Sequence, residues 1–465
     1  MIGLFGILKM GAESLAAQQL GTEVTGQNLA NVDNPAYARQ RVLLQTATTI
    51  QTPIGQQGTG VTAVSIQQVR DALLDNQIKS ETSVTGSLAA QQLALQNAEA
   101  GLGEQISGTS ATGQDGLSAG LSNLFSAFQA LTTAPTSLAQ RQVLIQTAQG
   151  LATQFNQVSS RLSDVHNALN TSIQNDVTSG NQLLGDIASL NKQIVYAEAA
   201  GGTANDLVDL RQQKLEALAK LSNITSTAQP NGSVDVSIGG VTMVSGIAQV
   251  DSLQTYDAGG GQILVRAQTA GTPLTLTSGS IEGEINVRDG ALATLQTNLN
   301  SLAAQLITQV NTIHAGGFDL NGGTGQNFFT GTDAATIGVN SALVADPSKI
   351  QASGAVGAAG DNTVALALAQ LANNNIAGLG NQTFSQNYSQ TVAGLGQSIA
   401  SLNDQVINHD TVMSMLSKQR SSVSGVSIDE EMTNLMQYQK AYQASAQLIT
   451  TVNQMLETVI SMKTV

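Results

Sequence analysis

A heptad pattern runs through the end of the chain, from Ser424 to Met462, and restricts the fold more than any other feature of the sequence. Its apolar residues alternate at steps of three and four, the spacing of a coiled-coil helix. The two core positions hold Ile428, Leu435, Tyr442, Ile449 and Leu456, and Met432, Gln439, Ala446, Asn453 and Ile460. At about 1.5 Å per residue, the predicted helix is roughly 50 Å long. Its apolar side is too extensive to face water, so the pattern predicts a partner helix.

The first turn of this helix carries the signals of a helix start. Ser427 and Glu430 have the spacing of a capping box, in which each side chain accepts a hydrogen bond from the backbone amide of the other residue. Negative charge also favours the positive end of the helix dipole, and three carboxylates lie there, Asp429, Glu430 and Glu431. We therefore expect the helix to begin at Ser427.

Two core positions of the pattern are polar, Gln439 and Asn453. They allow two interpretations. Either these residues lie slightly outside the helix contact, or they select the pairing register, because a polar core residue penalises misaligned pairing.

The partner helix is predicted at the other end of the chain. A weaker pattern of the same spacing comprises Leu4, Leu8, Gly11, Leu15, Gln18, Thr22, Thr25 and Leu29. Its second half is small and polar, which suits close approach of two helices but gives little stability to an isolated helix in water. We therefore expect the two terminal helices to pair and to enclose everything between them.

The composition limits the class of protein. Only 11% of the 465 residues are charged, and the formal net charge is -14. A surface of neutral polar groups suits subunits that pack side by side, because few charges must be desolvated. The negative charge argues against nucleic acid as a partner, and the absence of cysteine excludes disulfides and thiolate metal sites.

The sequence shows neither a membrane-spanning segment nor a signal peptide. No apolar run has the length of a membrane span. The N-terminus lacks the basic and then apolar layout of a cleaved signal peptide. We therefore expect neither a membrane span nor a cleaved signal peptide.

The periodicity along the chain predicts a mainly α fold with a small inserted β-rich region. We expect helices at 3–31, 68–100, 117–133, 135–200, 205–222, 289–314, 363–373 and 384–422, before the terminal helix. Alternation of period two predicts strands at 234–238, 241–244, 263–267, 274–276 and 285–287, with a hairpin turn at Gly239 and Gly240. In the helix at 205–222, the stretch 209–215 is typical of an ordinary amphipathic surface. The expected domains are a terminal coiled coil (1–45 and 423–465), a helical bundle (46–223 and 288–422) and the β-rich outer insertion (224–287).

Three separated stretches carry recognisable motifs. Asn28 to Gln40 reads NLANVDNPAYARQ, Ser424 to Glu431 reads SGVSIDEE, and the third stretch runs from Asn311 to Phe329. Together, and in this order, they resemble motifs of the bacterial flagellar axial proteins, among them the hook-associated ones. One departure is Ala36, which stands where the family usually has glycine.

The resemblance implies a structural role. It implies a helical coiled-coil base, a helical bundle, a smaller β-rich outer domain and the function of an adapter that joins hook to filament, outside the cell. The implied partners are the hook protein, the junction protein on the filament side, further copies of this chain in a helical lattice, and a cytoplasmic export chaperone at the C-terminal helix. We further expect the terminal helices to fold when they assemble.

The heptads and the motifs together give the candidate assembly residues. At the N-terminal end these are Leu4, Leu8, Leu15, Asn28, Ala30, Asn31, Asn34, Pro35 and Tyr37. At the C-terminal end they are Ile428, Met432, Leu435, Gln439, Tyr442, Ile449, Asn453 and Leu456.

Other functions fit the sequence less well. Flagellin or another axial component shares paired terminal helices, but the motif at 28–40 and the acidic box at 429–431 fit the adapter better. A secreted peptidoglycan hydrolase and a coiled-coil adhesin are further alternatives.

The serine-elbow pattern at 116–120 lies after a polar loop instead of a strand, the loop from Asp319 lacks the final glutamate of a calcium site, and the three histidines are dispersed. We predict no catalytic residue, no metal site and no cofactor.

Overall fold

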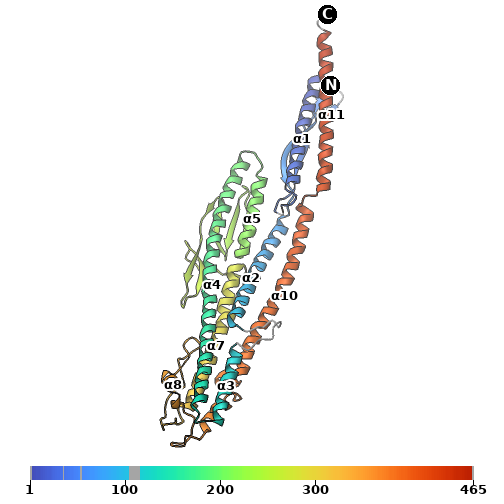
Figure 1. Ribbon diagram of the computed structural model, residues 1–465. Helices are drawn as coiled ribbons and strands as arrows, with labels where there is room; N and C mark the ends of the chain where they lie inside the picture. Colours follow the sequence, from blue (N-terminus) through green and yellow to red (C-terminus); the bar gives the residue numbers. More distant parts are fainter. Residues whose placement is uncertain (1–2, 35, 53–54, 104–115, 463–465) are drawn as a thin grey trace.

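The protein is described by a computed structural model that covers residues 3–34, 36–52, 55–103 and 116–462. The molecule is long, and its two termini lie together at one end (Figure 1). The fold is mainly α with a small β-containing insertion, as expected. The helices are α1 (Leu4–Ala30), α2 (Ala72–Leu102), α3 (Leu117–Thr133), α4 (Leu138–Ala199), α5 (Asn205–Leu221), α6 (Ser280–Val287), α7 (Ala293–His314), α8 (Ser341–Ala345), α9 (Thr363–Gln370), α10 (Phe384–Ser424) and α11 (Ile428–Ser461).

The long helices begin and end where local signals stop them. The Asp71 carboxylate accepts hydrogen bonds from the first amides of α2, and Gly103, with a φ of 67°, ends this helix. Ser137 caps α4, a helix of 62 residues. Thr383 and Gln386 form a complete capping box at the start of α10.

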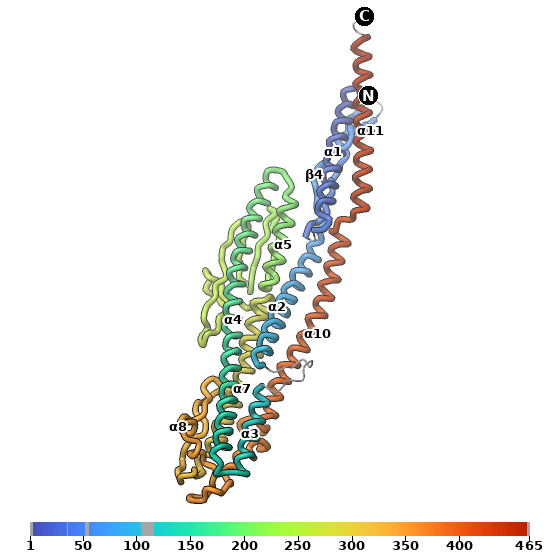
Figure 2. Tube along the Cα trace, viewed as in Figure 1, coloured from blue at the N-terminus to red at the C-terminus, as the bar shows by residue number. Residues whose placement is uncertain are grey.

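The larger core fills the end of the molecule opposite to the termini. Side chains of α3, α4, α7 and α10 meet there, and its buried aromatic and aliphatic groups include Leu124, Phe128, Phe155, Leu306 and Phe384. The chain between α7 and α10 is largely irregular and wraps this end (Figure 2), with the two-stranded pair β11 (Phe329–Thr330) and β12 (Gly338–Val339), the short α8 and α9, and the 3-10 turns η2 (Pro347–Lys349) and η3 (Ala377–Leu379).

His314, in the motif at 311–329, is a packing residue. It is fully buried beside Phe328. Its Nδ1 lies 2.8 Å from the Gln326 carbonyl oxygen, and its Nε2 accepts a hydrogen bond from the Gln351 amide at 3.0 Å. Burial lowers the pKa of the ring to about 4, so the imidazole is neutral and both nitrogens are used to connect loops.

The β-rich region packs on helices and shares their core. Its four-stranded antiparallel sheet has the order β5 (Ile224–Ala228), β6 (Val234–Ile238), β7 (Val241–Ser245) and β8 (Ala248–Gln249), and β9 (Leu253–Asp257) pairs with β10 (Ile263–Ala267). The predicted turn is present, with φ of 55° at Gly239 and 83° at Gly240. Under the strands lies a second core that includes Ile173 and Ile187 of α4, Leu218 of α5 and Ile281 of α6. The division of the chain at 224 and 287 stays a prediction, but these strands depend on helical residues from both sides of it.

Two predicted strands of this region are wrong. Residues 274–276 are irregular, and residues 285–287 belong to α6. Helix therefore resumes at Ser280 and continues through a π-helical turn, η1 (Arg288–Leu292), into α7. The reason is close packing on α2: a Cβ at Gly283 would lie 2.4 Å from the Ser87 carbonyl oxygen, so the glycine brings the helix against its neighbour.

Glu284 makes the stability of this region dependent on pH. Burial raises its pKa to about 7 from an ordinary value of 4.5, the hydrogen bond from Ser172 opposes the shift, and Asp176 adds to it. The folded state therefore binds more protons than the unfolded state between about pH 4.5 and 7, and stability falls as pH rises through this window.

We expect Glu284→Gln to stabilise the protein at pH 8 by on the order of 2 kcal/mol and to change its stability little at pH 4. Urea unfolding followed by circular dichroism at the two pH values measures the difference. An equal effect of the substitution at both pH values would show that folding does not raise the pKa of Glu284.

Candidate functional site

The terminal helices α1 and α11 pack antiparallel along one another (Figure 1). Residues seven positions apart on α1 (Ser14, Gly21 and Asn28) contact residues seven positions apart on α11, in the reverse order along the chain. Ser14 Oγ lies 2.9 Å from Ser445 Oγ, Gly21 lies against the ring of Tyr438, and Asn28 binds Glu431. The predicted pairing of the two ends is therefore present.

Small residues of α1 bring the two helices close. A Cβ at Gly11 would lie 2.8 Å from Ile449, and one at Gly21 would lie 2.6 Å from the Tyr438 ring. Both positions have helical backbones, so space and not backbone conformation requires glycine there. Besides these two glycines, the buried positions of α1 are Ala17, Val24, Thr25 and Asn28.

The contact keeps Gly11 and Thr25 of the predicted α1 pattern, but elsewhere it is shifted by one residue on each helix. In α1 it passes through Ala17, Gly21 and Val24 in place of Gln18 and Thr22. In α11 the first predicted core position is only partly buried in the contact. Leu435, Ile449 and Leu456 are half-buried, and Tyr442 is exposed. In place of the second predicted core position, the residues one position earlier lie in the contact. These are Glu431, Tyr438, Ser445 and Val452, which are buried or half-buried. The shift follows from the small side chains of α1, which admit Tyr438 where a heptad count expects Gln439.

Several candidate assembly residues consequently lie outside the buried part of the α1–α11 contact. Leu4, Leu8, Leu15 and Asn31 are half-buried, Ala30 and Asn34 are exposed, and Pro35 lies outside the described residues. On α11 the exposed candidates are Ile428, Met432, Gln439, Tyr442 and Asn453. Gln439 and Asn453 thus lie beside the intramolecular contact, as in the first of the two interpretations. Contacts of all these residues with neighbouring subunits stay a prediction.

Asn28 is the centre of the contact between the two ends of the chain. It is 1% exposed, and all its hydrogen-bonding positions are used. Its Oδ1 accepts from the Tyr37 hydroxyl and from the Gln40 amide, both at 2.9 Å. Its Nδ2 donates to the Gln40 carbonyl oxygen at 2.8 Å and to Glu431 Oε2 at 3.0 Å. One side chain therefore holds the turn after α1 and connects it to α11.

Arg39 completes this arrangement from the other side of Glu431. Its Nε donates to Glu431 Oε1 and its Nη1 to Glu430 Oε2, both at 2.7 Å. The Arg39 amide donates to the Ser424 carbonyl oxygen at 2.8 Å. The carboxylate of Glu431, only 2% exposed, thus has a partner on each oxygen.

The hydrogen bonds of the capping box predicted at Ser427 are absent, so this prediction is wrong. Ser427 is the N-cap residue of α11, and the first turn is acidic, but the Ser427 side chain makes no capping hydrogen bond. Glu430 bonds to Arg39 and not back to the Ser427 amide. The Arg39 guanidinium, 391 residues away in the sequence, is a charged donor and binds the carboxylate more strongly than the local amide would.

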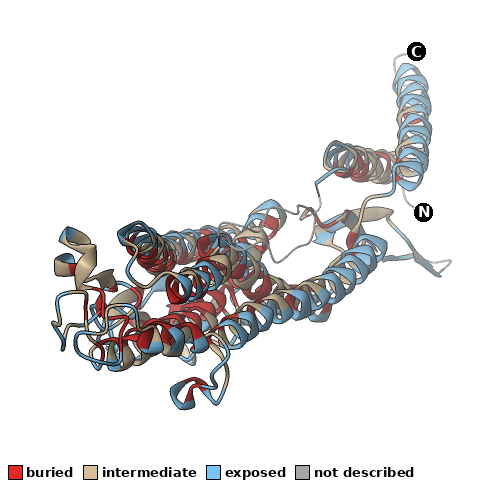
Figure 3. Ribbon diagram, turned by 60° about the horizontal axis from the view of Figure 1, so that its bottom comes forward, coloured by how far each residue is buried: buried red, intermediate tan, exposed pale blue. Residues whose placement is uncertain are grey.

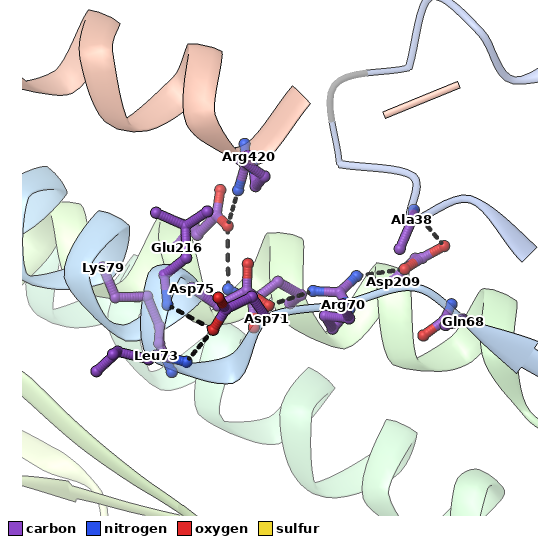
Figure 4. A network of polar contacts seen from close by, with 12 residues as sticks. Ala38, Gln68, Arg70, Asp71, Leu73, Asp75, Lys79, Asp209, Glu216 and Arg420 are labelled. Atoms are coloured by element: carbon purple, nitrogen blue, oxygen red, sulfur yellow. Dashed lines mark hydrogen bonds and ion pairs between the residues drawn. The ribbon is translucent and has the colours of Figure 1, made fainter. Parts of the chain in front are cut away.

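A second polar network fixes the bundle side of this junction (Figure 4). Arg70 lies between Asp75, at 2.8 Å, and Asp209, which it also contacts. Asp209 accepts a hydrogen bond from the Ala38 amide at 3.3 Å, so the motif after α1 is tied to α5. Burial raises the pKa of Asp209, and Arg70 opposes this shift. Arg420, at the end of α10, binds Glu216 of α5 at 2.6 Å.

The prediction that 209–215 forms an ordinary amphipathic surface is therefore wrong. Asp209, Arg211 and Gln212 are all buried. Gln212 bonds locally, to Glu216 one turn along α5 at 3.0 Å. Arg211 instead donates to Asn191 Oδ1 at 2.8 Å and to the Gly232 carbonyl oxygen at 2.7 Å, and no local spacing could have indicated these partners.

The strands after the first motif extend the junction along α1. β1 (Gln40–Thr46) pairs antiparallel with β4 (Val61–Gln68), and β2 (Ile50–Thr52) pairs with β3 (Gly55–Gln57). Gln40 Nε2 donates to Asp206 at 3.0 Å, and Asn205 donates to the Gln40 side chain at 3.2 Å. This hairpin thus also contacts α5.

The chain is similar throughout to known flagellar proteins. The family model of the flagellar hook-associated protein FlgK helical domain matches residues 103–329, and that of the flagellar basal body rod FlgEFG protein C-terminal region matches 417–462. Flagellar hook-associated protein 1 of Bacillus subtilis is 28% identical over 508 residues, which cover 99% of each chain. The protein of that name from Salmonella typhimurium is 25% identical over 566 residues, covering 98% of this chain and all of its own. The chain is thus similar over nearly its whole length to flagellar hook-associated protein 1.

A solved structure of a flagellar hook junction protein has the same fold. The flagellar hook junction protein FlgK from Burkholderia pseudomallei superposes with a TM-score of 0.64 at 17% identity, over 75% of this chain and all of that one. The family resemblance of the sequence motifs is thus confirmed. Within the described residues, no helix has the length and hydropathy to cross a bilayer, and no group of His, Asp or Glu side chains could hold a metal ion.

Proposed function

We propose that this protein is a structural, non-catalytic adapter that joins the flagellar hook to the filament, outside the cell. The observation that carries the proposal is the width of the apolar stripe on α11. The helix is mostly exposed (Figure 3), and α1 covers only one side of it. Apolar side chains that remain exposed include Ile428 (52%), Met432 (42%), Tyr442 (42%) and Ile460 (66%). Such a stripe is suited to burial against neighbouring subunits.

The partners in this proposal are the hook protein on one side, the junction protein on the filament side, and further copies of this chain around a helical lattice. The low charge content supports close packing, since between Glu431 and Met462 only Lys440 and Glu457 are charged. The name of the relatives, hook-associated protein, supports the position.

The assembly mechanism in this proposal is coupled folding. On the α1 side the contact with α11 is made mainly by small side chains and one polar centre, and most of α11 is exposed. Such a pair buries little apolar area, so it gains little free energy against the entropy of ordering until other subunits cover it.

We therefore expect the purified monomer to lose about residues 1–40 and 425–465 to limited proteolysis, with the bundle left intact. Amide exchange should be fast in the same segments and slow in assembled flagella. Protection of both ends in dilute monomer at the level of the bundle core would contradict coupled folding but not the adapter role.

Before export, we propose that a cytoplasmic chaperone covers the C-terminal helix, with Leu435, Tyr442, Ile449 and Leu456 as apolar anchors. A peptide of residues 424–465 should bind it, and calorimetry with the Tyr442→Ala peptide should show weaker binding.

Immunogold labelling of whole flagella tests the position. Gold at the hook–filament joint supports the adapter. Label along the whole filament would favour a flagellin-like component, and label at the cell wall would favour a peptidoglycan hydrolase or an adhesin.

A further inference from the structure

The exposed methionines of the chain are concentrated at its last two helices. The sequence has nine methionines. Met243, under the β-strands, is fully buried. The methionines with the largest exposed fractions are Met415 (58%), Met432 (42%), Met436 (56%), Met455 (51%) and Met462 (76%). Because oxidation of a methionine requires access to its sulfur, these helices are the part of the described structure most open to it.

Met432 and Met436 lie one turn apart on one ridge of α11. Ile428 precedes them by one more turn and is 52% exposed. Glu431 faces α1, where it binds Asn28. At 3.6 residues per turn, Met432 and Met436 lie about 100° and 140° around the helix from Glu431. The ridge therefore lies outside the buried part of the contact with α1.

The apolar character of this ridge depends on the two thioethers. They are two of its three side chains, whereas beside Met455 the exposed Leu448 and Val459 would stay apolar after any oxidation. A thioether side chain is also flexible and polarisable, so it packs against surfaces of different shape. Oxidation of both sulfurs would consequently make most of this ridge polar.

A peroxide is sufficient for this change. The sulfur attacks one oxygen of hydrogen peroxide, the O–O bond breaks, and the sulfur loses two electrons as the sulfoxide forms and the peroxide is reduced to water. A methionine sulfoxide reductase reverses the reaction with a dithiol, which is oxidised to a disulfide while the sulfoxide oxygen leaves as water. The sulfoxide oxygen accepts hydrogen bonds, so burying it without a donor weakens a contact between subunits.

We propose that Met432 and Met436 form a peroxide-sensitive modification site, whose conversion to sulfoxides in the unassembled chain prevents α11 from packing into the joint. The site is open before assembly and closed after it, because neighbouring subunits then cover the ridge. The inference rests on the proposed function in one respect, that subunits cover this side of α11.

Mass spectrometry of tryptic peptides tests access to the two sulfurs. Purified protein and isolated flagella would receive the same dose of hydrogen peroxide, with a synthetic methionine peptide in each sample to report the dose. In the purified protein we expect Met432 and Met436 to oxidise about tenfold faster than the buried Met243, and in flagella we expect both to be protected about tenfold. Equal oxidation of the two methionines in both samples would overturn the proposal.

Binding to isolated hooks tests the consequence. Hooks from cells that lack the protein would be incubated with the labelled full-length chain and sedimented. Peroxide should lower the binding of the native chain about tenfold, and a methionine sulfoxide reductase with dithiothreitol should restore it. The double variant Met432→Leu, Met436→Leu keeps apolar side chains of similar volume without sulfur, so its binding should be the same before and after peroxide.

This variant is the matched control for oxidation elsewhere, since it keeps every other methionine. An equal loss of binding by the variant and the native chain, or unchanged binding of the oxidised native chain, would overturn the proposed site. The oxidised native chain should also unfold at the same temperature as the oxidised variant, and a lower temperature would count against the proposal by showing that oxidation unfolds α11. Untreated protein that fails to bind hooks would contradict the adapter instead, and protection of the two thioethers in flagella would then decide the modification site alone.

Discussion

Replacing Asn28 by alanine should separate the two ends of the chain and abolish assembly. The substitution removes the donor to the buried Glu431 carboxylate and the acceptor for the Tyr37 hydroxyl and the Gln40 amide. Each buried polar group that is left without its hydrogen-bond partner costs about 1–3 kcal/mol, and the substitution removes a partner from Glu431, Tyr37 and Gln40. The contact between α1 and α11 has little apolar area with which to offset that cost.

Asn31→Ala is the matched control. Asn31 is an asparagine three residues later that is not buried, and its side chain donates only to the Gln27 carbonyl oxygen at 3.0 Å. We expect Asn28→Ala to remove attached filaments and to raise amide exchange throughout 4–40, whereas Asn31→Ala behaves as the native chain. Full assembly of the Asn28→Ala chain would show that the polar centre is dispensable.

Introducing a charge on the outward side of α11 should block assembly without unfolding the isolated chain. Met432→Asp and Tyr442→Asp place a carboxylate where the side chain is exposed in one molecule, at 42% in both cases. If subunits cover this surface, an unpaired charge buried there costs several kcal/mol. The free energy of unfolding of the monomer should change by no more than about 0.5 kcal/mol, as for ordinary surface substitutions.

Gln447→Asp gives the same charge on the same helix away from the apolar stripe, and should leave assembly intact. Motility and filament counts measure the outcome, and urea unfolding of the monomers shows that the fold is kept. If Met432→Asp and Tyr442→Asp swim like the native chain, the exposed stripe of α11 faces solvent in the flagellum.

The sequence alone predicts most of the helices and the pairing of the termini, because these depend on local periodicity. α1, α3, α5 and α10 begin within a few residues of their expected positions. The strand expected at 285–287 fails because β-branched Ile285 and Val287 suggest a strand, whereas packing of Gly283 against α2 favours a helix.

The candidate site was only partly predictable. Asn28, Tyr37 and Glu431 all lie in motifs that resemble the flagellar family, yet the bond between Asn28 and Glu431 joins residues 403 positions apart and has no signal in a single sequence. The heptad count missed Tyr438 and Val452 by one residue, because spacing alone does not show that Ala17 and Gly21 of α1 leave room for the Tyr438 ring. Arg70 and Asp209 resemble any surface pair until the fold brings α2 and α5 together.

Electron microscopy of cells that lack this protein tests the adapter role most directly. The account predicts complete hooks without filaments, free filament protein in the medium, and restoration of attached filaments by the native chain but not by Asn28→Ala. Filaments of normal number and length, attached to their hooks in the absence of this protein, would contradict it.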